Sequence, residues 1–519
     1  MTAPDSEALS SMGQWQQILT APPVWRVRVQ AASWTSAALA LRDQGGRLLG
    51  LWGEAGHENA FFYIHALGLG STGYLWITLT VQSSEGQFPS LADIFPAASR
   101  MERALYDLTG IRAAGNADTR PWLRHQCWPA GIFPLREGQL DDRSFGMDGD
   151  ADYPFQLIDS VDVHQIPVGP VHAGTIEPGH FRFSCIGEQI LRLEERLGYT
   201  HKGVERLFQD RDVFAGARLA GRISGDTTAG YAWAYCMAVE SIARCAIPPR
   251  AAALRAVCLE RERMANHLGD LAALGNDAGF AFCQSQFLFI KESLLRENRE
   301  IFGHRYLMDC IIPGGVAFDL NSAQTASIRS NSESWQRTVQ RLDLLLQEHS
   351  GLRDRLVGTG KIVPPRAAAL GMAGLAGRAS GQAWDLRVQF PHAPYQNLDV
   401  SMQLSPEGDV AARWQLRFRE FYESLRLQTR LLMELPVGDV SATIPESIPD
   451  GEGLGIVEAW RGEVFVALSV ENARIKRCHP HDPSWVLWPV LEEAVLNDIV
   501  ADFPLINKSF NLSYSGHDL

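Results

Sequence analysis

Short apolar runs alternate with turns over residues 1–135. The run GYLWITLTVQ, at residues 73–82, is rich in β-branched and aromatic residues and predicts a strand. After Pro96, apolar residues recur at helical spacing at Met101, Leu105 and Leu108, which predicts a helix that ends near Gly110. This combination is typical of a small α+β domain.

Helical patterns dominate the region from residue 200 to about 360. Before them, residues 136–165 are acidic and rich in glycine, which predicts a linker. A strand–turn–strand unit follows to about residue 195, and EVFVALSVENARIKRC predicts a strand pair near residue 470. We therefore expect a first domain at 1–135, a linker at 136–165 and a larger domain at 166–519.

Composition narrows the possible functions. The chain has 519 residues, 46% hydrophobic content and a net charge of −13, so we expect a sizeable core and no nucleic-acid partner. It has no run of about 20 apolar residues and no apolar N-terminal segment, so we expect neither a membrane span nor a signal peptide. The eight cysteines include no C-x-x-C pair, and no Walker loop or dinucleotide fingerprint occurs. We therefore expect that this chain binds no cofactor of its own.

Part of the first domain, FPSLADIFPAASRMERALYDLTGI, carries a specific signature. Its residues are Glu102, Arg103, Tyr106, Asp107, Leu108, Gly110 and Ile111. The segment resembles the small peripheral-arm subunit of respiratory complex I, whose relatives are fused to the N-termini of some membrane-bound hydrogenase large subunits. The resemblance implies an α/β-sandwich fold for residues 1–135.

Further stretches resemble the large subunit of energy-converting nickel–iron hydrogenases of the hydrogenase-4 and formate-hydrogenlyase type. The same stretches are similar to the complex I subunit that shares this fold and helps to form the quinone pocket. They are GPVHAGTIEPGHFRF at 169–183, YTHKGVERL at 199–207, LERERMANHLGDLAALGNDAGF at 259–280, IIPGGV at 311–316 and EAWRGEV at 458–464. The resemblance implies an α+β chain whose second domain is mainly helical, with a small peripheral antiparallel sheet. It implies NAD binding only at the level of the family.

In such hydrogenases, two pairs of cysteines hold nickel and iron, because this metal centre prefers soft thiolates. The resemblance places the first pair at Ser224 and Thr227 and the second at Ser513 and Gly516, so none of the four positions carries sulfur. Alcohols do not ionise near neutral pH unless a strong metal is already bound. We therefore expect no metal and a redox-inactive remnant of the site. A hard-metal site or another ligand is the alternative.

The complex I relatives also lack these cysteines and use the vacated space for a quinone headgroup. A loop histidine, a tyrosine and an aspartate serve this purpose there. His172 and His180 lie on the matching loop, and Asp277 takes the aspartate position. Gly225 replaces the tyrosine, and Tyr231 lies about one and a half helical turns further on. Quinone binding is therefore an alternative function.

Three carboxylates are candidates for proton transfer. Glu205, in HKGVERL, matches a hydrogenase glutamate that is implicated in this role, and a salt bridge to Lys202 or Arg206 is its structural alternative. Asp270 and Asp277 share a helical arc with leucines. They are therefore either partnered in the core, by arginines or helix ends, or line a wet cavity that carries protons.

The resemblance implies a peripheral-arm subunit of a membrane-associated oxidoreductase complex. This subunit would lack the nickel–iron site and couple electron transfer to ion translocation. The implied partners are an iron–sulfur small subunit, which holds the clusters, and antiporter-like integral membrane subunits, which hold the chain on the cytoplasmic face of the inner membrane. The alternatives are a quinone-reactive subunit of an NADH:quinone-type enzyme and a redox-inactive scaffold. An active hydrogenase is not expected.

Overall fold

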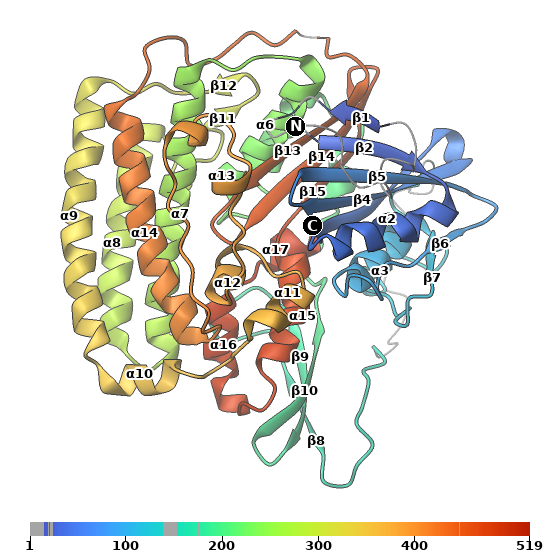
Figure 1. Ribbon diagram of the computed structural model, residues 1–519, viewed down its shortest axis with the longest axis horizontal. Coiled ribbons are helices and arrows are strands. Elements are labelled where there is room, and N and C mark those ends of the chain that lie inside the picture. The colour runs from blue at the N-terminus through green and yellow to red at the C-terminus, as the bar shows by residue number, and fades with distance from the viewer. Residues whose placement is uncertain are drawn as a thin grey trace.

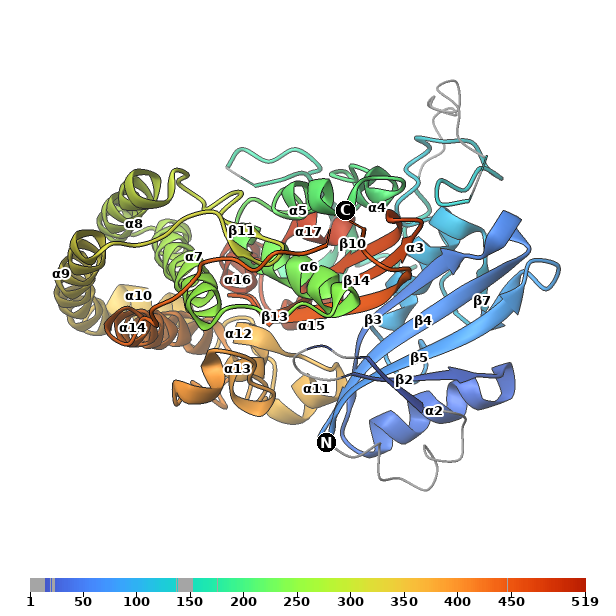
Figure 2. The same ribbon diagram turned by 90° about the horizontal axis from the view of Figure 1, so that it is seen from above.

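The computed structural model describes residues 15–18, 20, 24–136, 138, 153–174, 176–445 and 447–519. A sheet with its own helices lies at one side of the molecule and a bundle of long helices at the other, with a second sheet between them (Figure 1, Figure 2). The α+β class expected from the sequence is confirmed. Half of the predicted linker, residue 137 and residues 139–152, lies outside the described residues.

The N-terminal sheet has five strands in the order β1–β2–β5–β4–β3. Strands β2 and β5 are parallel, and the other neighbours are antiparallel. The strands are β1 (Trp15–Ile18), β2 (Val24–Val29), β3 (Arg47–Ala55), β4 (Phe61–Gly70) and β5 (Gly73–Gln82). Strand β5 coincides with the predicted strand GYLWITLTVQ.

Strand β5 is buried over residues 73–79 because both faces of its sheet are covered there. Leu75 and Ile77 belong to one core with residues of α2 (Ala31–Asp43) and α3 (Ala98–Thr109). Trp76, between them in sequence, joins a different core on the opposite face. Helix α3 ends where the sequence predicts, with Gly110 in the left-handed conformation at φ 74°. The remaining elements of this region are η1 (His57–Asn59), β6 (Gln87–Pro89) and β7 (Arg112–Ala114).

A second sheet lies in the interior, between the N-terminal sheet and helix α6 (Thr228–Ala243) (Figure 2). Its antiparallel strands are β13 (Gly451–Glu458), β14 (Glu463–Glu471) and β15 (Arg474–His481). The last two are the predicted strand pair. Strand β13 approaches α6 so closely that a Cβ atom at Gly455 would lie 1.9 Å from the carbonyl oxygen of Ala234. Only glycine permits this contact.

The two sheets meet at an aromatic stack. The indole ring of Trp52, on β3, lies between the imidazole rings of His65 and His479, at centroid distances of 5.1 and 4.9 Å. All three side chains are buried. The stack joins the N-terminal sheet to β15 and so fixes the first domain against the second.

Long helices form the bundle at the far side (Figure 1). They are α7 (Pro249–Asp277), α8 (Ala281–Phe302), α9 (Ser322–Gln347) and α14 (Val410–Met433). Shorter elements connect them to the rest of the chain: α4 (Val204–Phe208), α5 (Val213–Ala220), β11 (Ile311–Ile312), β12 (Gly315–Val316), α10 (Ser350–Leu356), α11 (Pro364–Ala369), α12 (Gly374–Ala379), α13 (Leu386–Gln389) and η2 (Tyr395–Asn397). None of the helices in the described part of the chain has the length and apolar character needed to cross a lipid bilayer.

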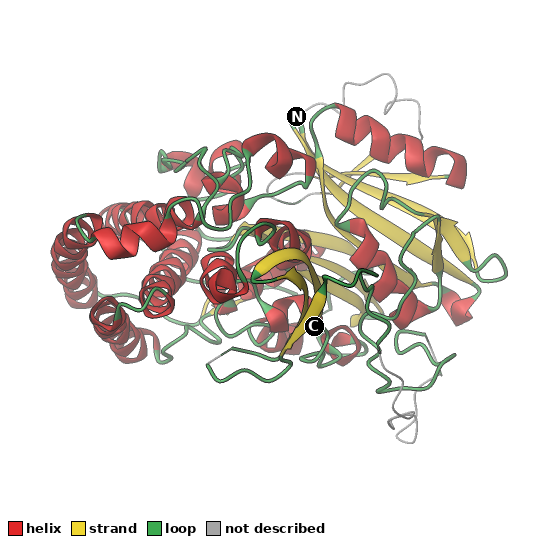
Figure 3. Ribbon diagram, turned by 90° about the horizontal axis from the view of Figure 1, so that it is seen from below, coloured by secondary structure: helices red, strands yellow, loops and turns green. Residues whose placement is uncertain are grey.

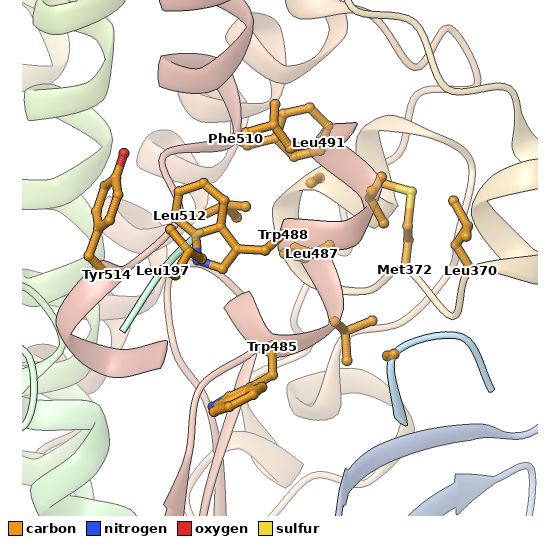
Figure 4. Packing of buried hydrophobic residues seen from close by; sticks show 14 of the residues in the cluster. Leu197, Leu370, Met372, Trp485, Leu487, Trp488, Leu491, Phe510, Leu512 and Tyr514 are labelled. Atoms are coloured by element: carbon orange, nitrogen blue, oxygen red, sulfur yellow. The ribbon is translucent and has the colours of Figure 1, made fainter. Parts of the chain in front are cut away.

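A third sheet is peripheral, as expected, and its strands appear as arrows near the C-terminus label in Figure 3. Its strands are β8 (His164–Val168), β9 (His180–Ile186) and β10 (Gln189–Arg196). The C-terminal segments α15 (Ser484–Ala494), η3 (Val500–Asp502), α16 (Phe503–Phe510) and α17 (Tyr514–Asp518) lie beside it. Trp488, Phe510 and Tyr514 pack into this corner of the core (Figure 4).

Paired charges fill part of the interior between the bundle and the second sheet. The guanidinium group of Arg378 is fully buried and donates to Glu420 Oε1 at 2.6 Å and to Glu458 Oε1 at 2.9 Å. Arg263 forms a close ion pair with the other oxygen of Glu420. These bonds connect α7, α12, α14 and β13, because each partner lies on a different element.

Removal of Arg378 is expected to destabilise the fold. The Arg378→Met variant leaves two carboxylates buried beside an apolar side chain, at a cost of about 3–5 kcal/mol in the free energy of unfolding. Chemical denaturation checks this value. The matched control is Arg337→Met, whose exposed partner Glu333 lies 4.0 Å away and whose loss should have no measurable effect. Equal effects in the two variants would contradict the assigned role of the buried network.

Acid is expected to destabilise the protein through its buried imidazoles. Burial, together with the charges of Arg26 and Arg477, lowers the pKa of His65 well below its usual value. The unfolded chain binds this proton at about pH 6.5 and the folded chain does not, so the contribution is present above about pH 6.5 and is lost as pH falls. Denaturation curves at pH 7.5, 6.5 and 5.5 should show this loss. His65→Gln should flatten the slope, whereas His57→Gln, at an exposed position, should not.

Candidate functional site

Ser224, Asp226 and Thr227 lie on the loop that leads into helix α6. The hydroxyl groups of Ser224 and Thr227 are buried and donate to Asp226 Oδ1 at 2.6 and 3.0 Å. The polar, glycine-containing loop and the helix after it are as the sequence predicts. Both hydroxyls are therefore directed at a carboxylate of their own loop.

The C-terminal segment brings the second predicted pair to the same place. Ser513 caps helix α17, where its Oγ atom accepts a hydrogen bond from the backbone amide of Gly516 at 2.9 Å. The same Oγ atom lies 3.2 Å from Ser224 Oγ, although the two residues are 289 positions apart. The four positions inferred from the resemblance are thus contributed by two segments that meet in the fold.

An ion pair lies beside these hydroxyl groups. Arg461, at the turn between β13 and β14, donates to Asp226 Oδ1 at 3.1 Å and forms a close ion pair with Oδ2. Burial raises the pKa of Asp226, but the charge and hydrogen bonds of Arg461 outweigh this effect and lower it to about 2. Asp226 is therefore ionised at neutral pH and holds no exchangeable proton there.

The start of helix α6 and the backbone next to the Asp226–Arg461 pair also form hydrogen bonds. Asn266 Nδ2 donates to the carbonyl oxygen of Asp226 at 2.7 Å, and Trp460 Nε1 donates to the same oxygen at 3.0 Å. The carboxylate of Glu262 accepts the amides of Ala229 and Gly230, at the start of α6. Burial raises the pKa of Glu262 to about 8, so this acid can exchange a proton near neutral pH.

Tyr231 is fully buried one helical turn into α6. Its hydroxyl group donates to Asp482 Oδ2 at 2.9 Å, and burial together with this carboxylate raises its pKa well above the usual value. The phenol is therefore protonated at physiological pH, and its hydroxyl group remains hydrogen-bonded to Asp482. A role for Tyr231 in ligand binding stays a prediction.

Glu205 has different partners from those the sequence indicated. It pairs with Arg477 Nη2 at 2.6 Å and His479 Nδ1 at 2.7 Å, both on β15. Burial raises its pKa, but these two partners lower it to about 2. The expected alternative of a bridge to Lys202 or Arg206 is wrong, because Lys202 Nζ donates to the carbonyl oxygen of Ile223 instead and Arg206 to Gln209.

The two aspartates on helix α7 lie in different surroundings. Asp270 is buried, accepts from Arg417 Nε at 2.8 Å and from Asn511 Nδ2 at 2.6 Å, and so has the arginine partner that the sequence allowed. Asp277, at the helix end, is half-buried, and desolvation raises its pKa. Asp270 thus has a structural role in joining α7 to α14, whereas a role for Asp277 in proton transfer stays a prediction.

The two loop histidines contact different backbone groups. His172 Nε2 lies 2.9 Å from the carbonyl oxygen of Gly179, within its own loop. His180, at the start of β9, contacts the carbonyl oxygen of Gly169 through Nδ1 at 3.3 Å and stacks near Phe155. Their proposed contact with a quinone stays a prediction.

The residues at the four positions that the resemblance assigns to nickel ligands are three hydroxyl-bearing residues and a glycine, which do not fit a centre that needs thiolates. That this protein lacks such a centre stays a prediction. A Cβ atom at Gly516 would lie 2.5 Å from Asp482 Oδ2 and 2.8 Å from Ser513 Oγ, so a cysteine there has no room. Across the described residues, no three histidine, cysteine, aspartate or glutamate side chains are grouped so as to hold a metal ion.

Asp226, Arg461 and Asp482 were not identified as site residues from the sequence. Asp226 offered a signal, since it stands between two of the inferred ligand positions in SGDT. Arg461 lay in the stretch EAWRGEV, but its separation of 235 residues from Asp226 gave no local hint of their pairing.

Comparison with known proteins places these features in a family. The sequence family described as "Respiratory-chain NADH dehydrogenase, 30 Kd subunit" matches residues 27–141, and "Respiratory-chain NADH dehydrogenase, 49 Kd subunit" matches residues 285–448. The chain is 29% identical over 485 residues to formate hydrogenlyase subunit 5 of Escherichia coli K12, which covers 92% of this chain and 85% of that protein.

Two further relatives extend the comparison. The carbon monoxide-induced hydrogenase of Rhodospirillum rubrum is 31% identical over 353 residues, covering 67% of this chain and 97% of that protein. A chain of the membrane-bound sulfane sulfur reductase, an archaeal respiratory membrane complex, superposes with a TM-score of 0.66 at 25% identity, covering 70% of this chain and all of that one. The chain therefore belongs to the family that unites hydrogenase large subunits with the 49 kDa subunit of respiratory-chain NADH dehydrogenase, and it carries a 30 kDa-type domain fused ahead of that subunit.

Proposed function

We propose that this chain is a peripheral-arm subunit of a membrane-associated, hydrogenase-4-like and complex I-like oxidoreductase complex that works without a nickel–iron centre. The main support for the proposal is the set of residues at the four inferred metal-ligand positions. Ser224, Thr227, Ser513 and Gly516 occupy the ligand positions, and the Asp226–Arg461 ion pair holds the segments together beside them.

The ion pair supplies a physical reason why the fold needs no metal there. In a hydrogenase of this type, the metals join the loop before α6 to the C-terminal segment. Here Asp226 joins that loop to Arg461, and Ser224 contacts Ser513 directly. Arg461, at the β13–β14 turn, bonds both to Asp226 of that loop and to the carbonyl oxygen of Asn511, so charge-assisted bonds through this turn also join the loop to the C-terminal segment.

Partners would carry the electrons and anchor the subunit. We assign the electron carriers to an iron–sulfur small subunit and the membrane anchor to antiporter-like integral membrane subunits, on the cytoplasmic face of the inner membrane. Support comes from the relatives, which include a hydrogenase and a chain of a respiratory membrane complex. In this arrangement the chain transmits the redox events of its partners to ion translocation.

A quinone-reactive role has less support. Gly225 stands where the headgroup tyrosine is expected, and the hydroxyl group of Tyr231 is already bonded to Asp482. His172 and His180 contact backbone carbonyl groups of their own loop region. We therefore do not extend the proposal to quinone reduction.

Metal analysis of the intact complex tests the proposal. We expect no nickel above background per copy of this chain, and iron in the amount that the partner's clusters account for. Inductively coupled plasma mass spectrometry on complex purified from its native membrane measures both. The control is a nickel–iron hydrogenase purified in the same way. One nickel per copy would overturn the proposal.

Substitution of Gly516 tests whether the space beside this residue is filled or open. Gly516→Ala forces a methyl group against Asp482 and Ser513 and should lower the free energy of unfolding by about 1–3 kcal/mol. The matched control is Gly225→Ala, where an added Cβ atom meets nothing within 4 Å. Thermal denaturation of the two variants compares them. Equal stability would show that the space beside Gly516 is open, against the proposed remodelling.

A further inference from the structure

A cavity of about 540 Å³ lies away from the former metal site. Its walls come from the loop after β7, from residues 153–155, from the start of β9, and from the end of β10 with Tyr199 beyond it. In Figure 1, β9 and β10 extend downward from the body of the molecule beside the segment that precedes β8. The volume is within the range of small-molecule pockets.

The lining of this cavity is basic. Among the described residues that form it are Arg124, Arg196, His125 and His180, and none of them is an aspartate or a glutamate. The rest of the lining is aromatic, small or uncharged. The positive charge of this lining comes from the two arginines, and no carboxylate of the lining opposes it, so the pocket presents a positive potential to whatever enters it.

Arg196 has no carboxylate partner within the described residues. Its Nη1 atom donates to the carbonyl oxygens of Pro121 and Trp122, and its ring neighbour is Tyr153 at 4.5 Å. The side chain is only 4% exposed, and burial lowers its pKa to about 10. A buried guanidinium group ordinarily has a counter-ion, as Arg378 does.

The nearby carboxylates are already engaged. Asp107 accepts the backbone amides of Trp122, Leu123 and Arg124, at 2.7, 2.7 and 3.3 Å. Glu194 and Asp118 are bonded to Arg120. These bonds hold the loop that presents Arg124 and His125 to the cavity. The negative charge of Asp107 offsets part of the charge of Arg196, but no carboxylate oxygen of the described residues forms an ion pair with this guanidinium group.

Burial is the main reason why the pKa of both histidines is low. Burial, followed by the charge of Arg196, lowers the pKa of His125 to about 4. Burial and the charges of Arg182 and His172 lower the pKa of His180. His125 Nε2 lies 2.6 Å from the carbonyl oxygen of Leu197, so the ring is held in place at the edge of the cavity.

We propose that this cavity binds a small molecule that carries a phosphate or carboxylate group. Its oxyanion accepts hydrogen bonds from Arg196 and Arg124, the two guanidinium groups of a lining that has no carboxylate among its described residues. The site is independent of the proposed function, because none of its residues belongs to the former metal site. It has the chemistry of an effector or substrate site on the boundary between the two domains.

Binding of anionic probes to the full-length chain, within its purified complex, tests the proposal. Isothermal titration with inorganic pyrophosphate and with citrate, at low ionic strength, should show saturable binding by at least one of them. Tighter binding of pyrophosphate would indicate a phosphate site, and tighter binding of citrate would indicate a carboxylate site. Arg124→Gln should weaken binding at least about tenfold, because a charge-assisted hydrogen bond is lost.

A matched control distinguishes binding in the cavity from non-specific attraction of anions to basic residues. Arg192→Gln removes a guanidinium group from the same strand, β10, at a position outside the cavity, and should leave affinity unchanged. Arg196→Lys, which keeps the charge and loses the planar fork, should also weaken binding. No saturable binding of either probe, or equal losses in the Arg124→Gln and Arg192→Gln variants, would overturn the proposal.

Discussion

The buried guanidinium group of Arg378, held between Glu420 and Glu458, exemplifies the constraint on which most of this structure depends. A charge that is removed from water needs a partner of opposite sign and good hydrogen-bond geometry. In this chain the partners lie on different elements, so each pair also decides which helix contacts which strand. The pair of Arg417 with Asp270 joins α14 to α7 in the same way.

Arg461 and Arg196 show two outcomes of that constraint. Arg461 finds its counter-ion in Asp226, and the pair joins the loop before α6 to the turn between β13 and β14. Arg196 is as well buried, but it forms no ion pair with a carboxylate in the described chain, and it borders a cavity. One arginine is therefore held in an ion pair, whereas the other has only the more distant charge of Asp107 and lines a cavity that an anion could enter.

Local patterns predicted much of the fold. Strand β5, helix α3 with its terminal Gly110, and the pair β14–β15 follow from short-range periodicity and turn chemistry, because these depend on neighbours in sequence. The resemblance also placed Ser224 and Ser513 at one site, and the fold brings them into contact. The partners of Glu205 could not be predicted, because Arg477 is 272 residues away and no periodicity encodes such a pairing. Nearby Lys202 and Arg206 were the only partners visible in the sequence.

The contact between the two ends of the second domain has a consequence for biosynthesis. Thr200 bonds to the carboxylate of Asp518 through both its amide and its hydroxyl group, across 318 residues. The region around residue 200 therefore leaves the ribosome long before its partner exists, at a translation rate of about 5–20 residues per second. The N-terminal sheet can form during this interval, but the amide and hydroxyl groups of Thr200 have to wait for the segment around Asp518 before they find this partner.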